Sequence, residues 1–220
     1  MIWKKKRLEN YRLQVIVNRP FFKNIPELAD AAAKAASAGN VVIQLRDKVS
    51  DKKTVLEEAQ VLRKRLAGTK SVFIVNDHAD IARIAGADGV HLGQSDLPLP
   101  AARQLLGRNR IIGISCVNLD QALEAQRSGA DYLGIGAVFS TGTKPESAPL
   151  GVGFTASVCA KIKIPVFAIG GITELNLREL ISSGCRRVAV SSAVCCAADP
   201  AISAGKFCEI LNSYDTVRAS

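Results

Sequence analysis

Short runs of apolar, often β-branched residues alternate along the whole chain with longer segments in which apolar residues recur at helical spacing. The expected strands occupy residues 13–17, 41–45, 72–75, 89–92, 111–114, 132–135, 166–169 and 187–190. Segments such as 25–38, 52–66 and 119–128 have the period of a helix with one buried face. Gly86 and Gly129 follow segments of this kind, where glycine is typical of a helix end. The pattern therefore predicts eight strands alternating with helices.

This order of elements predicts parallel strands joined by crossover helices. A chain of 220 residues fits a (β/α)8 TIM barrel forming a single domain, with a doubly wound open sheet as the competing architecture. Polar residues follow nearly every expected strand, which suits a ring of loops around a barrel mouth better than one crevice. We expect the barrel to span residues 11–214, between a basic extension at 1–10 and a tail at 215–220.

The second expected strand ends in polar residues at alternate positions, Gln44, Arg46 and Lys48. Because side chains alternate between the two faces of a strand, these three would leave it on the same side. Two cations and an amide suit a multiply charged anion such as a diphosphate. A strand end that simply meets solvent would carry the same charges, so the interpretation depends on the neighbouring strands.

Two carboxylates follow the next strands. Asn76 and Asp77 end the third expected strand, and Asp96 lies beyond the fourth. Facing the two cations, the carboxylates of Asp77 and Asp96 would hold Mg²⁺ against a diphosphate, although each could instead cap a helix or a turn. His91 lies inside a strand, where we expect a packed, hydrogen-bonded residue.

The ends of the fifth to eighth expected strands supply hydroxyls, glycines and one cation. They are Ser115, Thr141, Thr143, Lys144, Gly170, Gly171, Ser191 and Ser192. Loops after strands 7 and 8 of such barrels often bind a phosphate. An ordinary surface loop is also rich in these residue types, so the loop after the sixth strand alone decides nothing.

Composition narrows the class of protein. Hydrophobic residues make up 48% and charged residues 22%, enough for one buried core, and no apolar run approaches the ~20 residues of a membrane span. Six cysteines without a CxxC pair indicate reduced thiols in a cytoplasmic protein. The net charge is +9, but much of the excess lies in the first twelve residues, without a recognition motif. We expect neither nucleic acid nor a membrane as partner; oligomeric state stays open, homo-oligomers included.

Seven separated segments of the chain resemble the motifs of one family and follow one another in the order found in that family. The segments QLRDK, VND, GADGVHLGQSDLP, GIS, GADYLGIGAVFSTGTK, PVFAIGGI and VAVSSAV resemble the thiamine-phosphate synthase family, also called thiamine-phosphate pyrophosphorylase, over residues 11–212. The resemblance implies a transferase that joins 4-amino-2-methyl-5-hydroxymethylpyrimidine diphosphate to hydroxyethylthiazole phosphate. The products are thiamine monophosphate and diphosphate.

The resemblance also implies a role for each strand end. The pyrimidine diphosphate would contact Gln44, Arg46, Lys48, Asn76, Ser115 and Lys144, and Mg²⁺ would be held by Asp77 and Asp96. The thiazole phosphate would contact Thr141, Thr143, Gly170, Gly171, Ser191 and Ser192. In the dissociative mechanism of the family, diphosphate departs first, so Mg²⁺, Arg46, Lys48 and Lys144 would stabilise its charge without a side-chain nucleophile.

The chain departs from the family pattern at two positions. Val117 stands where a histidine is common, and Ser191 replaces an apolar residue before the phosphate serine. A thiazole tautomerase on the same barrel is one alternative, but it would use that histidine and not need Asp77 and Asp96. A non-catalytic sensor of thiamine phosphates, or a basic RNA-associated protein, is another. The complete set of cations and carboxylates favours the synthase.

Overall fold

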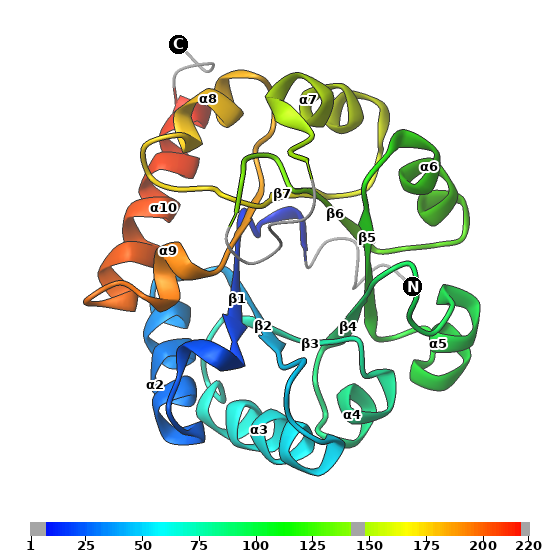
Figure 1. Ribbon diagram of the computed structural model, residues 1–220, viewed down its shortest axis with the longest axis vertical. Helices are drawn as coiled ribbons and strands as arrows, with labels where there is room; N and C mark the ends of the chain where they lie inside the picture. Colours follow the sequence, from blue (N-terminus) through cyan, green and yellow to red (C-terminus); the bar gives the residue numbers. More distant parts are fainter. Residues whose placement is uncertain (1–7, 142–147, 217–220) are drawn as a thin grey trace.

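The computed structural model describes residues 8–141 and 148–216, and these form a closed barrel. Eight parallel strands follow one another around the barrel in chain order, and helices surround them (Figure 1). The last strand pairs with the first, with Leu13 opposite Val188. This closure confirms the predicted TIM barrel and excludes the open sheet.

The observed elements agree closely with the pattern of the sequence. The strands are β1 (Leu13–Asn18), β2 (Val41–Arg46), β3 (Val72–Asn76), β4 (Gly89–Leu92), β5 (Ile111–Cys116), β6 (Tyr132–Gly136), β7 (Val166–Ile169) and β8 (Val188–Val190). The helices are η1 (Arg19–Phe21), α2 (Ile25–Ala36), α3 (Lys52–Arg65), α4 (Ala79–Ile84), α5 (Leu99–Leu106), α6 (Leu119–Arg127), α7 (Gly151–Lys161), α8 (Leu177–Ser182), α9 (Ser192–Cys195) and α10 (Pro200–Thr216). Strand bounds differ from those predicted by at most two residues.

Local chemistry explains where several helices begin and end. The side chains of Asn24, Asp51 and Asn118 each accept a hydrogen bond from the amide three residues later, which caps α2, α3 and α6. Gly86 and Gly129 follow α4 and α6 with φ of +69° and +90°, a left-handed conformation that glycine adopts without strain. The predicted helix ends at these two glycines are therefore confirmed.

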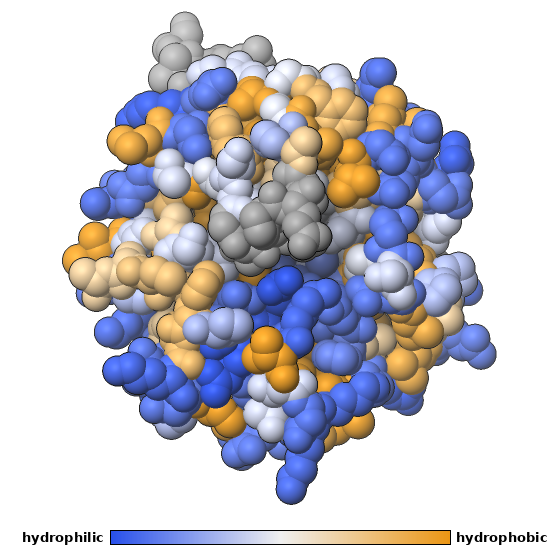
Figure 2. Space-filling view, viewed as in Figure 1, coloured by the Kyte–Doolittle hydropathy of each residue, from blue (hydrophilic) through white to orange (hydrophobic). Residues whose placement is uncertain are grey.

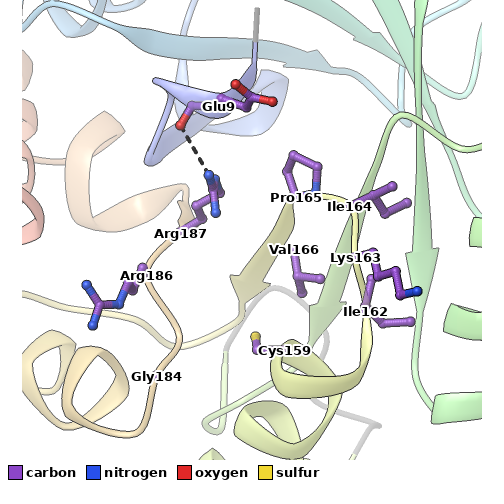
Figure 3. A pocket seen from close by; sticks show the side chains of 10 residues that line it. All are labelled: Glu9, Cys159, Ile162, Lys163, Ile164, Pro165, Val166, Gly184, Arg186 and Arg187. Carbon is purple, nitrogen blue, oxygen red and sulfur yellow. Dashed lines mark hydrogen bonds between the residues drawn. The ribbon is translucent and has the colours of Figure 1, made fainter. Parts of the chain in front are cut away.

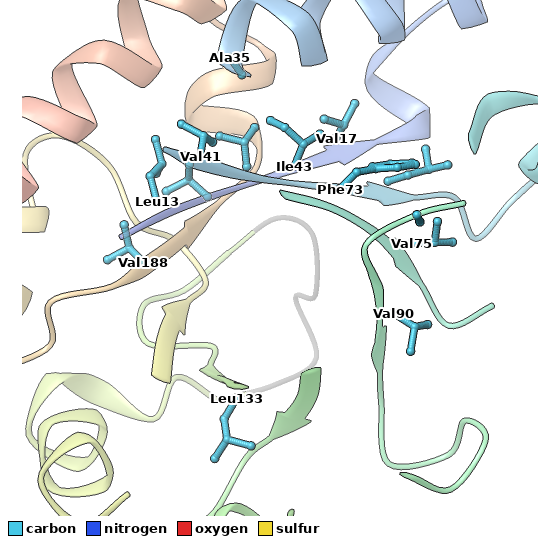
Figure 4. Close-up of a cluster of buried hydrophobic side chains, with 14 of the residues drawn as sticks. Leu13, Val17, Ala35, Val41, Ile43, Phe73, Val75, Val90, Leu133 and Val188 are labelled. Atoms are coloured by element: carbon cyan, nitrogen blue, oxygen red, sulfur yellow. The ribbon is translucent and has the colours of Figure 1, made fainter. Parts of the chain in front are cut away.

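Because successive side chains point to opposite faces of a strand, the buried hydrophobic residues form two clusters. The larger one lies between the outer face of the strands and the helices, where Leu13, Val41 and Phe73 pack with residues such as Ala35 of α2 (Figure 4). The smaller one fills the barrel interior, with Ile74 among its members. Leu8, which precedes the predicted start of the barrel domain, belongs to this interior cluster. Polar inward residues such as Asn18, Arg46 and Asn76 end their strands, which places these polar groups at one mouth, whereas Gln14 lies deeper in the barrel.

The opposite end of the barrel has a different character. A pocket of about 280 Å³ opens between the segment that enters β7 and the one that enters β8 (Figure 3). Its lining residues are Glu9, Cys159, Ile162, Lys163, Ile164, Pro165, Val166, Gly184, Arg186 and Arg187. None of the predicted site residues lies there.

Two sequence-based expectations concern the surroundings of the protein. All six cysteines are free thiols, as the sequence indicated. Within residues 8–141 and 148–216, no helix combines the length and the apolar character that crossing a membrane requires.

Candidate active site

The carboxyl ends of β2, β3 and β4, with the loops that follow them, carry half of the predicted polar residues. In the space-filling view, hydrophilic surface gathers near the centre of the face, over these three strands (Figure 2). The register places their ends side by side, with Leu45 of β2 opposite Val75 and Asn76 of β3 opposite His91. The predicted diphosphate side of the mouth is therefore one continuous surface.

A row of buried amides crosses the first three strands. Gln14 donates a hydrogen bond to Gln44 at 3.0 Å, and Gln44 donates one to Asn76 at 3.0 Å. Within the described part of the chain, the side-chain nitrogen of Asn76 has no hydrogen-bond partner. Because a buried donor without a partner is costly, this nitrogen is suited to a ligand at the mouth. Gln44 uses its amide oxygen and one hydrogen of its amide nitrogen in this row, and so holds the Asn76 side chain in place.

Arg46 ends β2 with its guanidinium half-buried. It donates a hydrogen bond to the Asn18 side chain at 2.6 Å, across the β1–β2 pair in which these two residues face each other. Burial lowers the pKa of Arg46, and the nearby charge of Asp77 opposes that shift. Arginine nevertheless remains a cation in proteins, so β2 presents a fixed positive charge at the mouth.

Lys48 reaches the same side for a reason other than strand alternation. The strand ends at Arg46, so Lys48 lies in the following turn. There Asp47 accepts hydrogen bonds from the amides of Val49 and Ser50, at 2.8 and 3.0 Å, and turns the chain. The ammonium of Lys48 then lies 2.9 Å from the carboxylate of Asp77. Lys48 therefore reaches the predicted side of the mouth, but through this turn and not along a continuous strand as the sequence predicted.

Asp77 and Asp96 meet beside Lys48. Asp77 has φ of +62°, and its amide donates to the His91 carbonyl at 2.8 Å, which holds the turn after β3 over β4. Asp96 accepts a hydrogen bond from the Gly93 amide at 2.6 Å. Neither caps the following helix, because His78 and Pro98 occupy those positions. The alternative reading of the two carboxylates as helix caps is therefore wrong.

The electrostatics of the carboxylate pair fit a cation. Burial and the neighbouring Asp96 raise the pKa of Asp77, against the opposing effect of Lys48. Burial acts upward on Asp96 as well, but the Gly93 amide, Asp77 and Lys48 hold the pKa of Asp96 below its usual value. Within the described residues, no group of three or more acidic, histidine or cysteine side chains could hold a metal ion. Two carboxylates suit Mg²⁺, which commonly takes its other ligands from water and substrate phosphate.

Ser115 is joined to a buried network under the mouth. Its hydroxyl lies 2.8 Å from Nε2 of His91, and Nδ1 of His91 lies 2.9 Å from the Tyr132 hydroxyl. Gln94 donates a hydrogen bond to the Ser115 carbonyl at 2.7 Å. The expectation of a packed, hydrogen-bonded His91 is confirmed, and the histidine also orients a predicted ligand of the pyrimidine substrate.

The predicted thiazole-phosphate side is built largely from backbone. Gly170 and Gly171 have φ of +103° and +64°, and a Cβ on Gly171 would lie 2.5 Å from the Ser140 carbonyl oxygen. These glycines therefore let β7 pack against the segment after β6. The Ser191 hydroxyl donates to the Ile16 carbonyl at 2.6 Å, whereas Ser192 begins α9. Thr141 is half-buried at the edge of the described segment.

Two predicted residues, Thr143 and Lys144, lie outside the described residues. Among the described ones, inspection of the sequence missed Gln14 and Asn18, which contact Gln44 and Arg46. A signal was present, because Gln14 and Asn18 occupy alternate positions with Ile16 in an otherwise apolar strand. The pattern therefore marked the inward face of β1.

Comparison with known proteins shows relatives in sequence and in fold. Residues 13–194 match the family model described as thiamine monophosphate synthase. The thiamine-phosphate synthase of Shouchella clausii (strain KSM-K16) is 42% identical over 87% of this chain and 92% of its own length. That of Synechococcus sp. (strain CC9311) is 42% identical over 90% of this chain, which spans 56% of that relative. A solved thiamine phosphate pyrophosphorylase from Pyrococcus furiosus is 33% identical, with a TM-score of 0.84 over 95% of this chain and 98% of its own.

Proposed function

The chain belongs to the thiamine monophosphate synthase family, and we propose that its barrel mouth holds the two phosphorylated substrates on opposite sides. The reaction is that of a transferase. It joins 4-amino-2-methyl-5-hydroxymethylpyrimidine diphosphate to hydroxyethylthiazole phosphate and releases diphosphate. The diphosphate is assigned to the ends of β2–β4, and the thiazole phosphate to those of β6–β8.

The observation that carries this assignment is the group of charges around Asp77. Lys48 lies 2.9 Å from Asp77, Asp96 interacts with the same carboxylate, and the charge of Arg46 acts on it. Alternating positive and negative groups at the ends of neighbouring strands suit an anion that arrives with a divalent cation.

We assign Mg²⁺ to Asp77 and Asp96. When bound, the ion supplies positive charge to the diphosphate oxygens and makes diphosphate a better leaving group. Lys48 is the counter-charge of Asp77 in the structure described here, so its ammonium is in reach of the same oxygens. The two carboxylates thereby position the lysine as well as the metal.

Charge stabilisation of the departing diphosphate is the main catalytic task of the side chains. Arg46 and Lys48, together with Lys144, would bind the leaving group more strongly as its negative charge develops in a dissociative step. A nucleophilic side chain is not required. Cys116, directly after Ser115, does not supply one, because burial raises the pKa of its thiol to about 12.

Backbone groups hold the thiazole phosphate in this proposal. The Ser191 hydroxyl is engaged with β1, so Ser192 and the amides near Gly170 and Gly171 are the available donors. Thr141 and Thr143 would contact the same phosphate from the segment after β6. The thiazole nitrogen then faces the carbon that loses diphosphate.

The six free thiols support a reducing compartment such as the cytoplasm.

One experiment tests the reaction and the site together. Purified protein is mixed with both phosphorylated substrates and Mg²⁺, and thiamine monophosphate and diphosphate are quantified. We expect the two products to form in equal amounts. Isomerisation of the thiazole phosphate alone, without diphosphate release, would instead indicate the tautomerase alternative. That alternative has no use for Asp77 and Asp96 as a pair.

A further inference from the structure

A carboxylate is fully buried on α3, outside the mouth. Glu58 has an exposed fraction of 0% and lies on the face of α3 that also buries Val55, Ala59 and Leu62. A charged residue at such a position is rare unless it is paired. Glu57, its neighbour in the same helix, is exposed.

Two charged groups contact Glu58 from other elements. Nε of Arg19, in η1, lies 2.8 Å from its carboxylate, and the carboxyl group of Asp47 lies within hydrogen-bonding reach. Asp47, like Glu58, is buried, with an exposed fraction of 3%. Glu58 therefore connects the ends of β1 and β2 from behind the mouth.

The pattern of hydrogen bonds indicates a proton between the two carboxyl groups. Among the described residues, neither oxygen of Glu58 has an aligned hydrogen-bond donor, nor does Oδ2 of Asp47. Oδ1 of Asp47 already accepts from the amides of Val49 and Ser50. One proton on Glu58 would supply the missing donor to Oδ2. Burial and the charge of Asp47 raise the pKa of Glu58 to about 7, despite the nearby Arg19.

We infer that protonated Glu58 is a positioning residue for the diphosphate substrate, because it fixes Asp47 and thereby the turn that directs Lys48 to the mouth. The inference rests on the proposed role of Lys48 in binding the diphosphate. Glu58 itself does not touch the substrate. Its action passes through Asp47, whose other oxygen holds the amides on the far side of Lys48.

The first test separates positioning from simple stabilisation of the fold. Glu58→Ala should raise the KM for the pyrimidine diphosphate about 10-fold and change the KM for the thiazole phosphate less than about 2-fold. Glu58→Gln, which keeps a hydrogen-bond donor at the same place, should restore the original value. Glu57→Ala is the matched control and should have no effect.

The second test uses pH. The pKa of Glu58 is about 7 in the folded protein and 4.5 in the unfolded chain, so the folded state binds this proton more tightly. The free energy of unfolding therefore decreases as the pH rises from about 4.5 through 7. Between pH 5 and pH 8, the melting temperature of the unmodified protein should therefore fall about 5 °C more than that of Glu58→Gln. Asp47→Asn keeps a side-chain oxygen for the amides of Val49 and Ser50 but removes the charge beside Glu58. The melting temperature of this variant should therefore also lack the additional fall between pH 5 and pH 8.

The outcomes separate a positioning role of Glu58 from a purely structural one and from failure of the proposed site. If Glu58→Ala lowers the melting temperature without a selective rise in KM, Glu58 only stabilises the fold and the inference is wrong. If Glu58→Ala does not fold, a selective KM rise from pH 6 to pH 8.5 that Glu58→Gln abolishes would support it, and an unchanged KM would overturn it. If Lys48→Ala also leaves the pyrimidine-diphosphate KM unchanged, the proposed site itself is wrong.

Discussion

The two sides of the barrel mouth, to which we assign the two phosphorylated substrates, are built from different groups. At the ends of β2–β4, charged side chains contact one another, as Lys48 and Asp77 do at 2.9 Å. At the ends of β7 and β8, the described residues are glycines and serines, with φ of +103° and +64° at Gly170 and Gly171. The first side depends on paired charge and the second on the course of the backbone.

This difference corresponds to what each substrate must do. A diphosphate that leaves develops negative charge, so fixed cations and the proposed metal site would act on the rate. A monophosphate that only anchors the second substrate keeps its charge throughout the reaction. Backbone amides and hydroxyls are sufficient for that anchor, and they contribute mainly to binding.

The largest expected effect is on the proposed metal site. Excess chelator, or Asp77→Ala or Asp96→Ala, should reduce turnover about 1,000-fold while thiazole-phosphate binding stays nearly unchanged. Mn²⁺ should substitute for Mg²⁺. Steady-state product formation and direct binding of the thiazole phosphate measure the two effects. Asp80→Ala is the control, since the Asp80 side chain is half-exposed and pairs with Lys52 at 3.0 Å. Full activity in chelator would remove the metal from the mechanism.

The next effect concerns Lys144, which lies outside the described residues and is predicted from the sequence alone. Lys144→Ala should lower kcat roughly 100-fold, about 3 kcal/mol of barrier, because its charge acts mainly on the departing diphosphate. The KM values should change much less. Protection of its loop from proteolysis should require bound substrates or product. An unchanged kcat with a higher KM for the diphosphate would make Lys144 a static anchor.

A smaller effect is expected for Arg46. Arg46→Ala should raise the KM for the pyrimidine diphosphate roughly 30-fold, equivalent to about 2 kcal/mol for hydrogen bonds to a charged group. The KM for the thiazole phosphate should stay near its original value. Arg65→Ala, at an exposed ion pair with Asp30, is the control. A rise confined to the thiazole phosphate would reverse the assignment of the two sides.

The smallest effect is expected on the backbone side. Ser192→Ala should raise the KM for the thiazole phosphate about 5-fold, or about 1 kcal/mol for one hydrogen bond. Ser191→Ala should leave that KM nearly unchanged, because the Ser191 hydroxyl donates to the Ile16 carbonyl. Titration of each variant with the thiazole phosphate gives the comparison. Equal losses in both variants would mean that the second serine has no special contact.

Much of this site could be predicted from the order of residues at the strand ends. Gln44, Arg46, Asn76 and Asp77 follow apolar runs, and the period of two places inward residues on one face. The sequence could not show that Ser191 turns its hydroxyl toward β1, because that contact joins residues 175 positions apart. Nor did it show that Gly171 accommodates Ser140.

The sequence by itself determined the strands, the closed barrel and the family. The spacing of hydrophobic residues and the residues next to each strand are local properties of the sequence, and they act before distant segments meet. Only the tertiary structure decided which polar groups are partners. It joined Lys48 to Asp77, Gln14 to Gln44, and Glu58 to Arg19. The physical reason is that hydrogen bonds and ion pairs act over a few ångströms, and the pairing of strands and the packing of helices bring residues distant in sequence that close.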